Sequence, residues 1–126
     1  MAYAQNTAVP VERSKMEIER TVLKYGATGF ITGWRKNDQA LVTFEMNDRR
    51  VRFILPLPQE DDTNKISRKK WEKECRRLWR ALALCIKAKL EAVESGISQF
   101  EEEFMPYFVM SNGMTVAERI IPDLTN

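Results

Sequence analysis

The longest regular pattern of apolar positions in the chain lies within residues 67–93. Apolar residues recur there at steps of four and three, with one lysine off the pattern, which is the spacing of one face of an α-helix. We therefore predict one long amphipathic helix over 67–93. Its apolar face is predicted to consist of Trp71, Cys75, Leu78, Leu82, Cys85, Lys89 and Val93, widened by Ile86 and Leu90, and to bury both cysteines as thiols.

Basic residues form a second regular series on the same predicted helix. Steps of four, three, four and seven place them on one ridge beside the apolar face. The series is Lys69, Lys73, Arg76, Arg80 and Lys87. Such a ridge either binds something negatively charged or is simply solvated, and the pattern leaves both interpretations open.

A shorter helical pattern precedes three patterns of alternating residues. Ser14 and Glu17 have the spacing of a capping box, and Gly26 can end a helix, so a helix over 15–25 is expected to bury Ile18, Val22 and Tyr25. Alternation over 30–34, 40–46 and 51–55, with turns at 36–38 and 47–48, predicts an antiparallel three-stranded meander. The inward side chains should be Ala40, Val42, Phe44, Val51, Phe53 and Leu55, and the outward ones Leu41, Thr43, Glu45, Arg50, Arg52 and Ile54.

Shorter elements are expected around the long helix. Residues 59–66 read as an exposed loop, Gly96 ends or kinks the long helix, and helical spacing from Ile97 to Phe104 predicts a short helix up to Pro106. Residues 107–110 are a possible fourth strand. Asn112 and Gly113 indicate a turn, and Thr115 with Glu118 caps a last short helix that should end before Pro122.

The order of these elements predicts an α+β fold: helix, three-stranded antiparallel meander, long amphipathic helix, then short elements, with the helices on one face of the sheet. The length of 126 residues fits one domain, over 11–126, preceded by a flexible arm over 1–10. No apolar run is long enough to span a bilayer and no signal peptide precedes the domain, so a soluble, unexported protein is expected.

The composition argues against most enzyme classes. The chain has no histidine, its two cysteines lack the spacing of a zinc site, and its five glycines form no phosphate-binding loop. The acidic clusters at 60–62 and 101–103 are interpreted as solvated rather than as metal sites. We expect no enzymatic activity, no cofactor and no metal.

Charge is distributed unevenly although the net charge is only +2. Eight basic residues fall within 65–80, against two glutamates, so the long helix is the predicted nucleic-acid-binding element. The candidate residues are Lys69, Lys73, Arg76, Arg77 and Arg80, with Arg50 and Arg52 as additions. Trp34 and Trp79 would add base stacking if exposed.

Two other hypotheses remain open. The apolar face, through Trp71, Leu78, Trp79 and Leu82, could contact a host or defence protein, or a second copy of the chain as a homo-oligomer. A third interpretation is capture of a small anionic nucleotide by Arg50, Arg52 and an aromatic side chain.

Two resemblances bear on function. The helix, three-strand, helix order resembles the double-stranded RNA-binding domain, in which a basic second helix meets phosphates. The match is one of topology, because residues 68–73 read RKKWEK and lack the alanine of that family's Lys-Lys-x-Ala-Lys pattern. The stretches ERTVLKYGATGF, RRVRFILPLP, RRLWRALALCIKAKLEAVESGI, FEEEFMPYFVM and NGMTVAE resemble a family of small uncharacterised proteins of bacteriophages and bacterial mobile elements. That resemblance implies an accessory protein in the cytoplasm of a bacterial host, acting on nucleic acid or on a host or defence protein.

Overall fold

The structure, a computed structural model, describes residues 9–36, 38–59 and 65–124. Most of the predicted arm over 1–10 and of the predicted loop over 59–66 lies outside these residues. The elements are α2 (Val11–Lys24), β1 (Gly29–Arg35), β2 (Gln39–Met46), β3 (Arg49–Pro56), α3 (Lys65–Glu94), α4 (Phe100–Phe104), the 3₁₀ turn η1 (Met105–Tyr107) and α5 (Val116–Leu124). This order confirms the predicted α+β fold and the long helix, which is slightly longer at both ends than predicted.

The three strands form an antiparallel sheet in the order β1-β2-β3. Phe44 in the central strand lies opposite Phe30 on one side and Val51 on the other. Asn47 and Asp48 both have positive φ angles, of 54° and 61°, as a two-residue type I′ hairpin turn requires. The predicted turn at 47–48 is therefore confirmed, whereas the turn at 36–38 includes a residue outside the described range.

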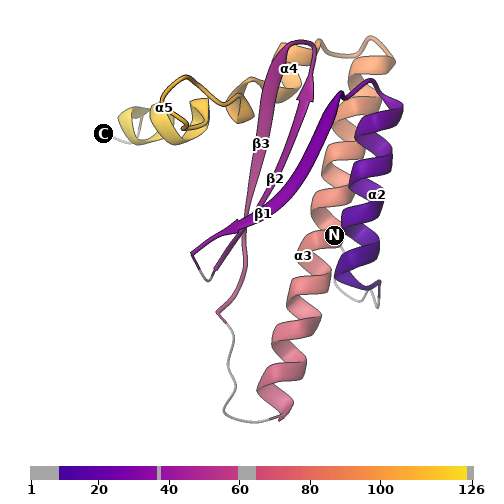
Figure 1. The fold of residues 1–126 in the computed structure, drawn as a ribbon, viewed down its shortest axis with the longest axis vertical. Helices are drawn as coiled ribbons and strands as arrows, with labels where there is room; N and C mark the ends of the chain where they lie inside the picture. The colour runs from indigo at the N-terminus through magenta and orange to yellow at the C-terminus, as the bar shows by residue number, and fades with distance from the viewer. Residues whose placement is uncertain (1–8, 37, 60–64, 125–126) are drawn as a thin grey trace.

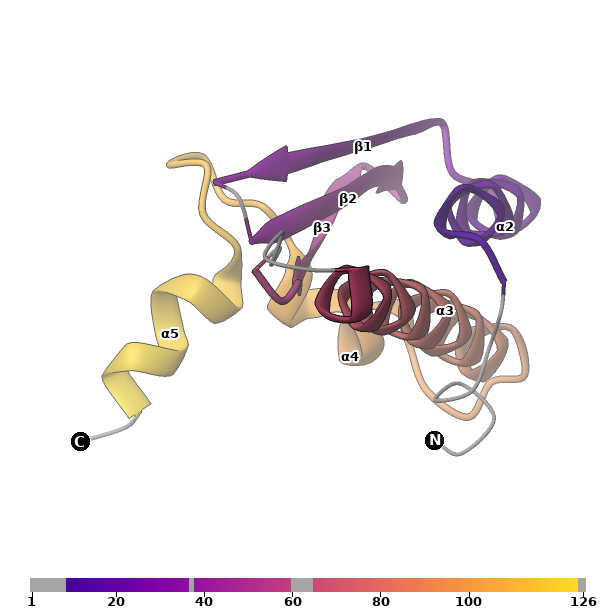
Figure 2. The same ribbon diagram turned by 90° about the horizontal axis from the view of Figure 1, so that it is seen from below.

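Helices α2, α3 and α4 lie on one face of the sheet (Figures 1 and 2). α3 and α4 lie beneath it, and α2 runs alongside α3 near β1 (Figures 1 and 2). Phe104 of α4 contacts Phe44 and Phe53 edge-on, with ring centroids 6.0 Å and 6.3 Å away. All the side chains predicted to point inward are buried: Ala40, Val42, Phe44, Val51, Phe53 and Leu55.

Glycines end both long helices through the same motif. Gly26 follows α2 with φ of 107°, and Gly96 follows α3 with φ of 78°. After each helix, the glycine amide and the next amide bond back to carbonyls three and five residues earlier, for example Ala27 N to Val22 O at 2.9 Å. This is the Schellman motif, in which glycine is favoured because a Cβ is strained at positive φ. Both predicted helix ends are confirmed.

The predicted start of the first helix is wrong. α2 begins at Val11, and Pro10 is its N-cap in extended conformation, with its carbonyl accepting the amides of Arg13 and Ser14. Ser14 is therefore inside the helix, fully buried, and its hydroxyl has no hydrogen-bond partner. The helix can begin at Val11 because the Pro10 carbonyl accepts amides of the first turn, one turn before the apparent capping box.

The short helix after α3 also starts later than predicted. Ile97 is 81% exposed and takes part in the glycine turn, because its amide bonds to Ala92 O. α4 begins at Phe100, where Gln99 and Glu102 form the capping box. The helical spacing of Ile97, Phe100 and Phe104 therefore predicted a helix that starts about one turn too early.

The segment after η1 does not form a fourth strand. Phe108 makes a single bridge to Val51, and Val109 makes another to Thr115. Pro106 lies within η1, immediately before this segment, and the turn at Gly113 follows it directly, so the chain touches the edge of β3 only briefly. The contact nevertheless covers part of that edge, through the bond from Val109 N to Arg50 O at 2.8 Å.

α5 continues past the predicted stop. It contains Pro122 and ends at Leu124. A proline in a helix lacks one amide donor, yet in a helix of nine residues it removes a single bond near the last turn. The proposed end before Pro122 was therefore wrong, whereas the predicted capping box is confirmed: Thr115 and Glu118 exchange backbone-to-side-chain bonds of 3.0 Å and 3.1 Å.

Glu118 joins α5 to the sheet as well as capping the helix. Its carboxylate accepts the Thr115 amide and a bond from Arg35 Nη2 at 3.0 Å. The Thr115 amide and the Arg35 guanidinium together hold the pKa of Glu118 below its ordinary value of 4.5, against an opposing effect of burial. A group whose pKa is lowered by folding stabilises the folded state above its unfolded pKa, and this contribution disappears as pH falls through the folded pKa.

We expect Glu118→Gln to be less stable than the wild type at neutral pH. Glutamine can still accept the Thr115 amide, so the substitution removes mainly the charge. The stability difference should shrink as pH falls below about 4.5, because the Glu118 carboxyl is then protonated more readily in the unfolded chain than in the folded one, until both are protonated. Urea unfolding of both proteins between neutral and acidic pH measures this difference, and a difference that is constant with pH would refute the role of the charge.

Candidate nucleic-acid interface

The buried face of α3 is rotated from the face predicted by its apolar spacing. Cys75 and Leu82 are buried as expected, together with Ile86 and Leu90. Cys85, however, is exposed, and Trp79 is only 3% exposed. The reason is that α2 packs along one flank of α3, which brings the buried face round to include Trp79 and Ala83 and moves Cys85 out to the solvent. Burial also raises the pKa of Cys75, so that this thiol stays neutral.

The same packing divides the predicted basic ridge. Arg80 forms an ion pair with Glu17 of α2. The Nε atom of Arg76 is buried without a hydrogen-bond partner, and Lys87 borders a depression lined mainly by α2. The second half of the ridge therefore faces α2 instead of forming an open surface. Arg77, the residue after Arg76, forms an ion pair with Glu74, which lowers the pKa of that glutamate.

The first turns of α3 extend beyond α2. The two helices run in the same direction, and the Lys15 ammonium lies 5.1 Å from the centre of the Trp79 ring (Figure 1). Val11, four residues before Lys15, is therefore level with about Cys75. The roughly ten residues of α3 that precede this level project by about 15 Å at 1.5 Å per residue.

Three lysines of this projecting segment are exposed: Lys69, Lys70 and Lys73. We call them the basic end. None of them has an ion pair with another residue in the described part of the chain. Arg68, beside them, contacts Glu72 at 3.6 Å and lies over the Trp71 ring. The basic end thus presents three closely spaced positive charges to solvent.

Arg50 and Arg52 are not part of this surface. They project from β3 on the face of the sheet opposite α3, where Arg50 contacts Glu45 at 3.1 Å and Arg52 donates to Gly113 O at 2.9 Å. With Arg49 they border a separate depression of about 550 Å³. The sheet therefore separates the two groups of basic residues that sequence reasoning combined.

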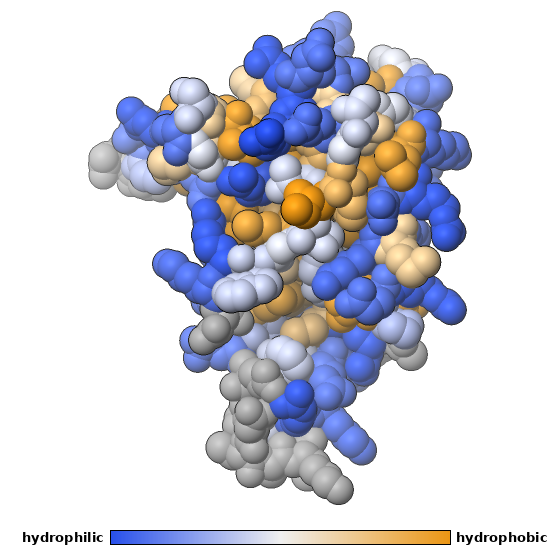
Figure 3. Space-filling view, viewed as in Figure 1, coloured by the Kyte–Doolittle hydropathy of each residue, from blue (hydrophilic) through white to orange (hydrophobic). Residues whose placement is uncertain are grey.

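The residues of the alternative partner surface are mostly used within the chain. Trp79 and Leu82 are buried in the core, and Leu78 packs against it. Trp71 is half-buried and donates its indole hydrogen to Pro58 O at 2.8 Å. The predicted partner surface of α3 is consequently covered by the sheet and by α2. Figure 3 shows polar and apolar side chains interspersed on the face viewed there.

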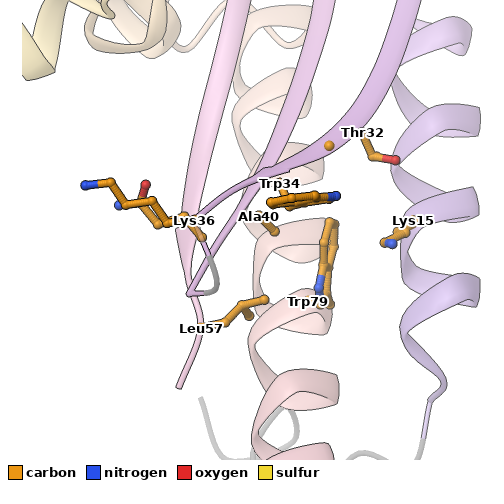
Figure 4. A pocket seen from close by; sticks show the side chains of 9 residues that line it. Lys15, Thr32, Trp34, Lys36, Ala40, Leu57 and Trp79 are labelled. Atoms are coloured by element: carbon orange, nitrogen blue, oxygen red, sulfur yellow. The ribbon is translucent and has the colours of Figure 1, made fainter. Parts of the chain in front are cut away.

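The sequence did not predict a cavity that is lined by residues of β1, α2 and α3. It has a volume of about 440 Å³ and lies between the end of β1, the start of α2 and the middle of α3. Figure 4 shows the indoles of Trp34 and Trp79 next to each other, with Lys15 approaching from α2 and Lys36 pointing away. We call it the tryptophan pocket, defined by Trp34, Trp79 and Lys15.

The sequence does contain a signal for this pocket. Trp34 pairs with Ala40, whose side chain is buried on the helix-covered face, so alternation places Trp34 on the same face. Trp34 is nevertheless 77% exposed, since it lies at the end of the sheet where α2 begins. Trp34 and Trp79 were predicted to add base stacking if exposed: Trp34 is exposed and Trp79 is buried, and the sequence did not indicate that both line one cavity with Lys15.

The described residues contain no cluster of acidic or cysteine side chains suited to a metal ion. Within the same residues, no helix is long and apolar enough to cross a membrane. Comparisons of the chain with models of protein families, with curated proteins and with solved structures gave no match.

The position of Arg80 leads to a prediction that separates a structural role from a binding role. Arg80→Gln should lower the free energy of unfolding by about 1 kcal/mol, because it leaves a partly buried Glu17 carboxylate without its partner. Denaturant unfolding measures this loss. Glu17→Gln should cost a similar amount, and the double variant less than the sum, whereas full additivity would contradict a direct contact.

Proposed function

We propose that the protein is a non-enzymatic nucleic-acid-binding domain whose basic end contacts the phosphate backbone. The observation that carries the proposal is the exposure of Lys69, Lys70 and Lys73 on a helix segment that projects beyond α2, without ion pairs to other described residues. Ion-paired basic residues elsewhere on α3 are poorer candidates, because an anion would have to displace their carboxylate partners.

The physical basis is the release of counterions from nucleic acid. Each lysine that neutralises a phosphate releases condensed cations, so affinity falls as salt rises, with little dependence on sequence. The three lysines lie on exposed faces of a segment that extends beyond α2, while Trp71 on another face of the same segment packs against Pro58. Three lysine–phosphate contacts are suited to binding in the micromolar range at low salt.

The resemblances in the sequence are consistent with this proposal. The order of elements is similar to that of a domain that contacts phosphates through the start of its second helix. The similarity to small bacteriophage and mobile-element proteins favours an accessory role inside a bacterial cell. Neither resemblance assigns a particular nucleic acid.

Binding can be tested directly by fluorescence anisotropy. Labelled single-stranded and double-stranded DNA and RNA of mixed sequence would be titrated with the wild-type protein from about 50 to about 200 mM salt. We expect binding that weakens steeply over this range. Absence of binding to all four nucleic acids at the lowest salt would refute the proposal.

A protein contact is the second candidate function, and α5 is the element that favours it. Ile120, Ile121 and Leu124 are exposed on this amphipathic helix, and Leu124 is 73% exposed. Figure 1 shows α5 extending away from the sheet and the other helices. Exposed apolar side chains on one helix face are typical of interaction sites.

Light scattering after size exclusion tests this second candidate. If α5 joins two copies, the measured mass will be about twice 14.7 kDa, and Ile121→Glu with Leu124→Glu will return it to one chain. A monomer would exclude self-association and restrict the hypothesis to a different protein.

A further inference from the structure

The tryptophan pocket has the features of a site for one planar, electron-rich ring. Trp34 forms one wall and presents most of its indole to solvent, while the ring of Trp79 forms the floor (Figure 4). The volume of about 440 Å³ lies within the range of roughly 300–1,000 Å³ that is usual for small-ligand sites. Thr32 and Gln39 also border it and supply polar groups that can bond to the edge of a ring.

The charge at the pocket favours an anionic ligand. The Lys15 ammonium lies over the Trp79 ring at 5.1 Å, at the side where α2 meets the pocket. Its contact with Glu12 is long, at 3.4 Å, and Glu12 is largely exposed, so Lys15 can exchange this partner for a phosphate at little cost. A ring that carries a phosphate therefore matches both the walls and the charge of the pocket.

The pocket also lies close to the basic end along α3. Trp79 is six residues after Lys73, which corresponds to about 9 Å along the helix axis and about a third of a turn around it. A strand that passes Lys73 and turns partly around α3 towards Lys15 can therefore bring an unpaired base to Trp34.

We infer that the tryptophan pocket binds an unpaired nucleobase of the strand whose phosphates contact the basic end. This inference rests on the proposed function and specifies its ligand: the protein favours single-stranded nucleic acid over duplex. Trp34 supplies the stacking surface and Lys15 holds the adjacent phosphate. Base stacking on an exposed aromatic side chain depends little on the base, so weak sequence preference is expected.

The test compares two oligonucleotides that differ only in their bases: oligothymidylate of twelve nucleotides and an abasic strand of equal length. Wild-type protein should bind oligothymidylate about 10-fold more tightly than the abasic strand. Trp34→Ala should bind both strands with the affinity that the wild type has for the abasic one, whereas Trp34→Phe should keep part of the preference. Trp34 is mostly exposed, so both variants should fold, as circular dichroism would verify.

Three outcomes would overturn one or both proposals, and they can be told apart. Equal affinity of the wild type for both strands refutes the base pocket but leaves backbone binding intact. Failure to bind either strand refutes the proposed function and the base pocket with it. Binding of free thymidine monophosphate more tightly than oligothymidylate overturns the assignment to a strand and identifies a mononucleotide as the ligand.

Discussion

Replacing Lys69, Lys70 and Lys73 by glutamine should weaken nucleic-acid binding about 10-fold or more at moderate salt. Each phosphate contact contributes about 0.7 to 0.9 to the slope of log affinity against log salt, so the loss of three should reduce that slope by about 2 to 3. These side chains are exposed, and the part of the chain described gives them no ion pairs. The variant should therefore unfold at nearly the same denaturant concentration as the wild type.

A matched control separates the position of the charges from their number. Arg20→Gln, Lys24→Gln and Lys87→Gln remove the same total charge around a depression between α2 and α3, away from the basic end. Lys87 is fourteen residues after Lys73, or about 21 Å along α3. We expect the control to keep most of the affinity and of the salt slope. Equal losses in the two variants would show that binding depends on net charge alone.

Phe104→Ala should be among the most destabilising single substitutions in the chain, lowering the free energy of unfolding by about 3–5 kcal/mol. Phe104 has no solvent exposure and joins α4 to the sheet through Phe44 and Phe53. It also contacts Phe100, with ring centroids 5.1 Å apart. Truncation removes buried apolar surface and leaves a cavity that the three remaining rigid rings cannot easily close.

Ile97→Ala is the control for this substitution. Ile97 lies seven residues before Phe104 and was predicted to share its helix face, but it is 81% exposed. Its truncation should change stability by less than about 0.5 kcal/mol. Urea titration gives both values, provided that the slopes with denaturant agree among the proteins. A loss below about 1 kcal/mol for Phe104→Ala would contradict the aromatic cluster.

The strands were predictable because their signal is local. Alternation over β2 and β3 determines which side chains face the helices. If the inward positions of both strands were shifted by one residue, Phe44 and Phe53 would point to solvent. Gly26 and Gly96 were equally informative, since a backbone with positive φ after a helix selects glycine. Each of these features depends on a few neighbouring residues and on no distant contact.

The surface of α3 could not be predicted, because it depends on where α2 lies. Apolar spacing assigned Cys85 to the core and left Trp79 at the edge, and α2 reversed both positions. The basic series appeared uniform in sequence, yet Arg80 meets Glu17, sixty-three residues away, and Lys73 meets no carboxylate in the described residues. A contact between residues so far apart in the sequence leaves no periodic pattern in it and cannot be predicted from residue spacing.

The predicted start of the first helix was wrong for a different reason, because two local signals compete there. Ser14 and Glu17 have capping-box spacing, but Pro10 starts the helix one turn earlier. The helix starts there although the buried Ser14 hydroxyl has no hydrogen-bond partner, which lowers stability.

Mapping the bound surface by amide NMR tests the central claim most directly. Twelve-nucleotide oligothymidylate would be added to isotopically labelled wild-type protein at low salt. We predict that the largest shifts will fall on the backbone amides of Lys69, Lys70 and Lys73 and on the indole of Trp34, while α5 and the outer face of β3 remain unchanged. Shifts concentrated at Arg50 and Arg52, or no shifts at all, would contradict this account of the protein.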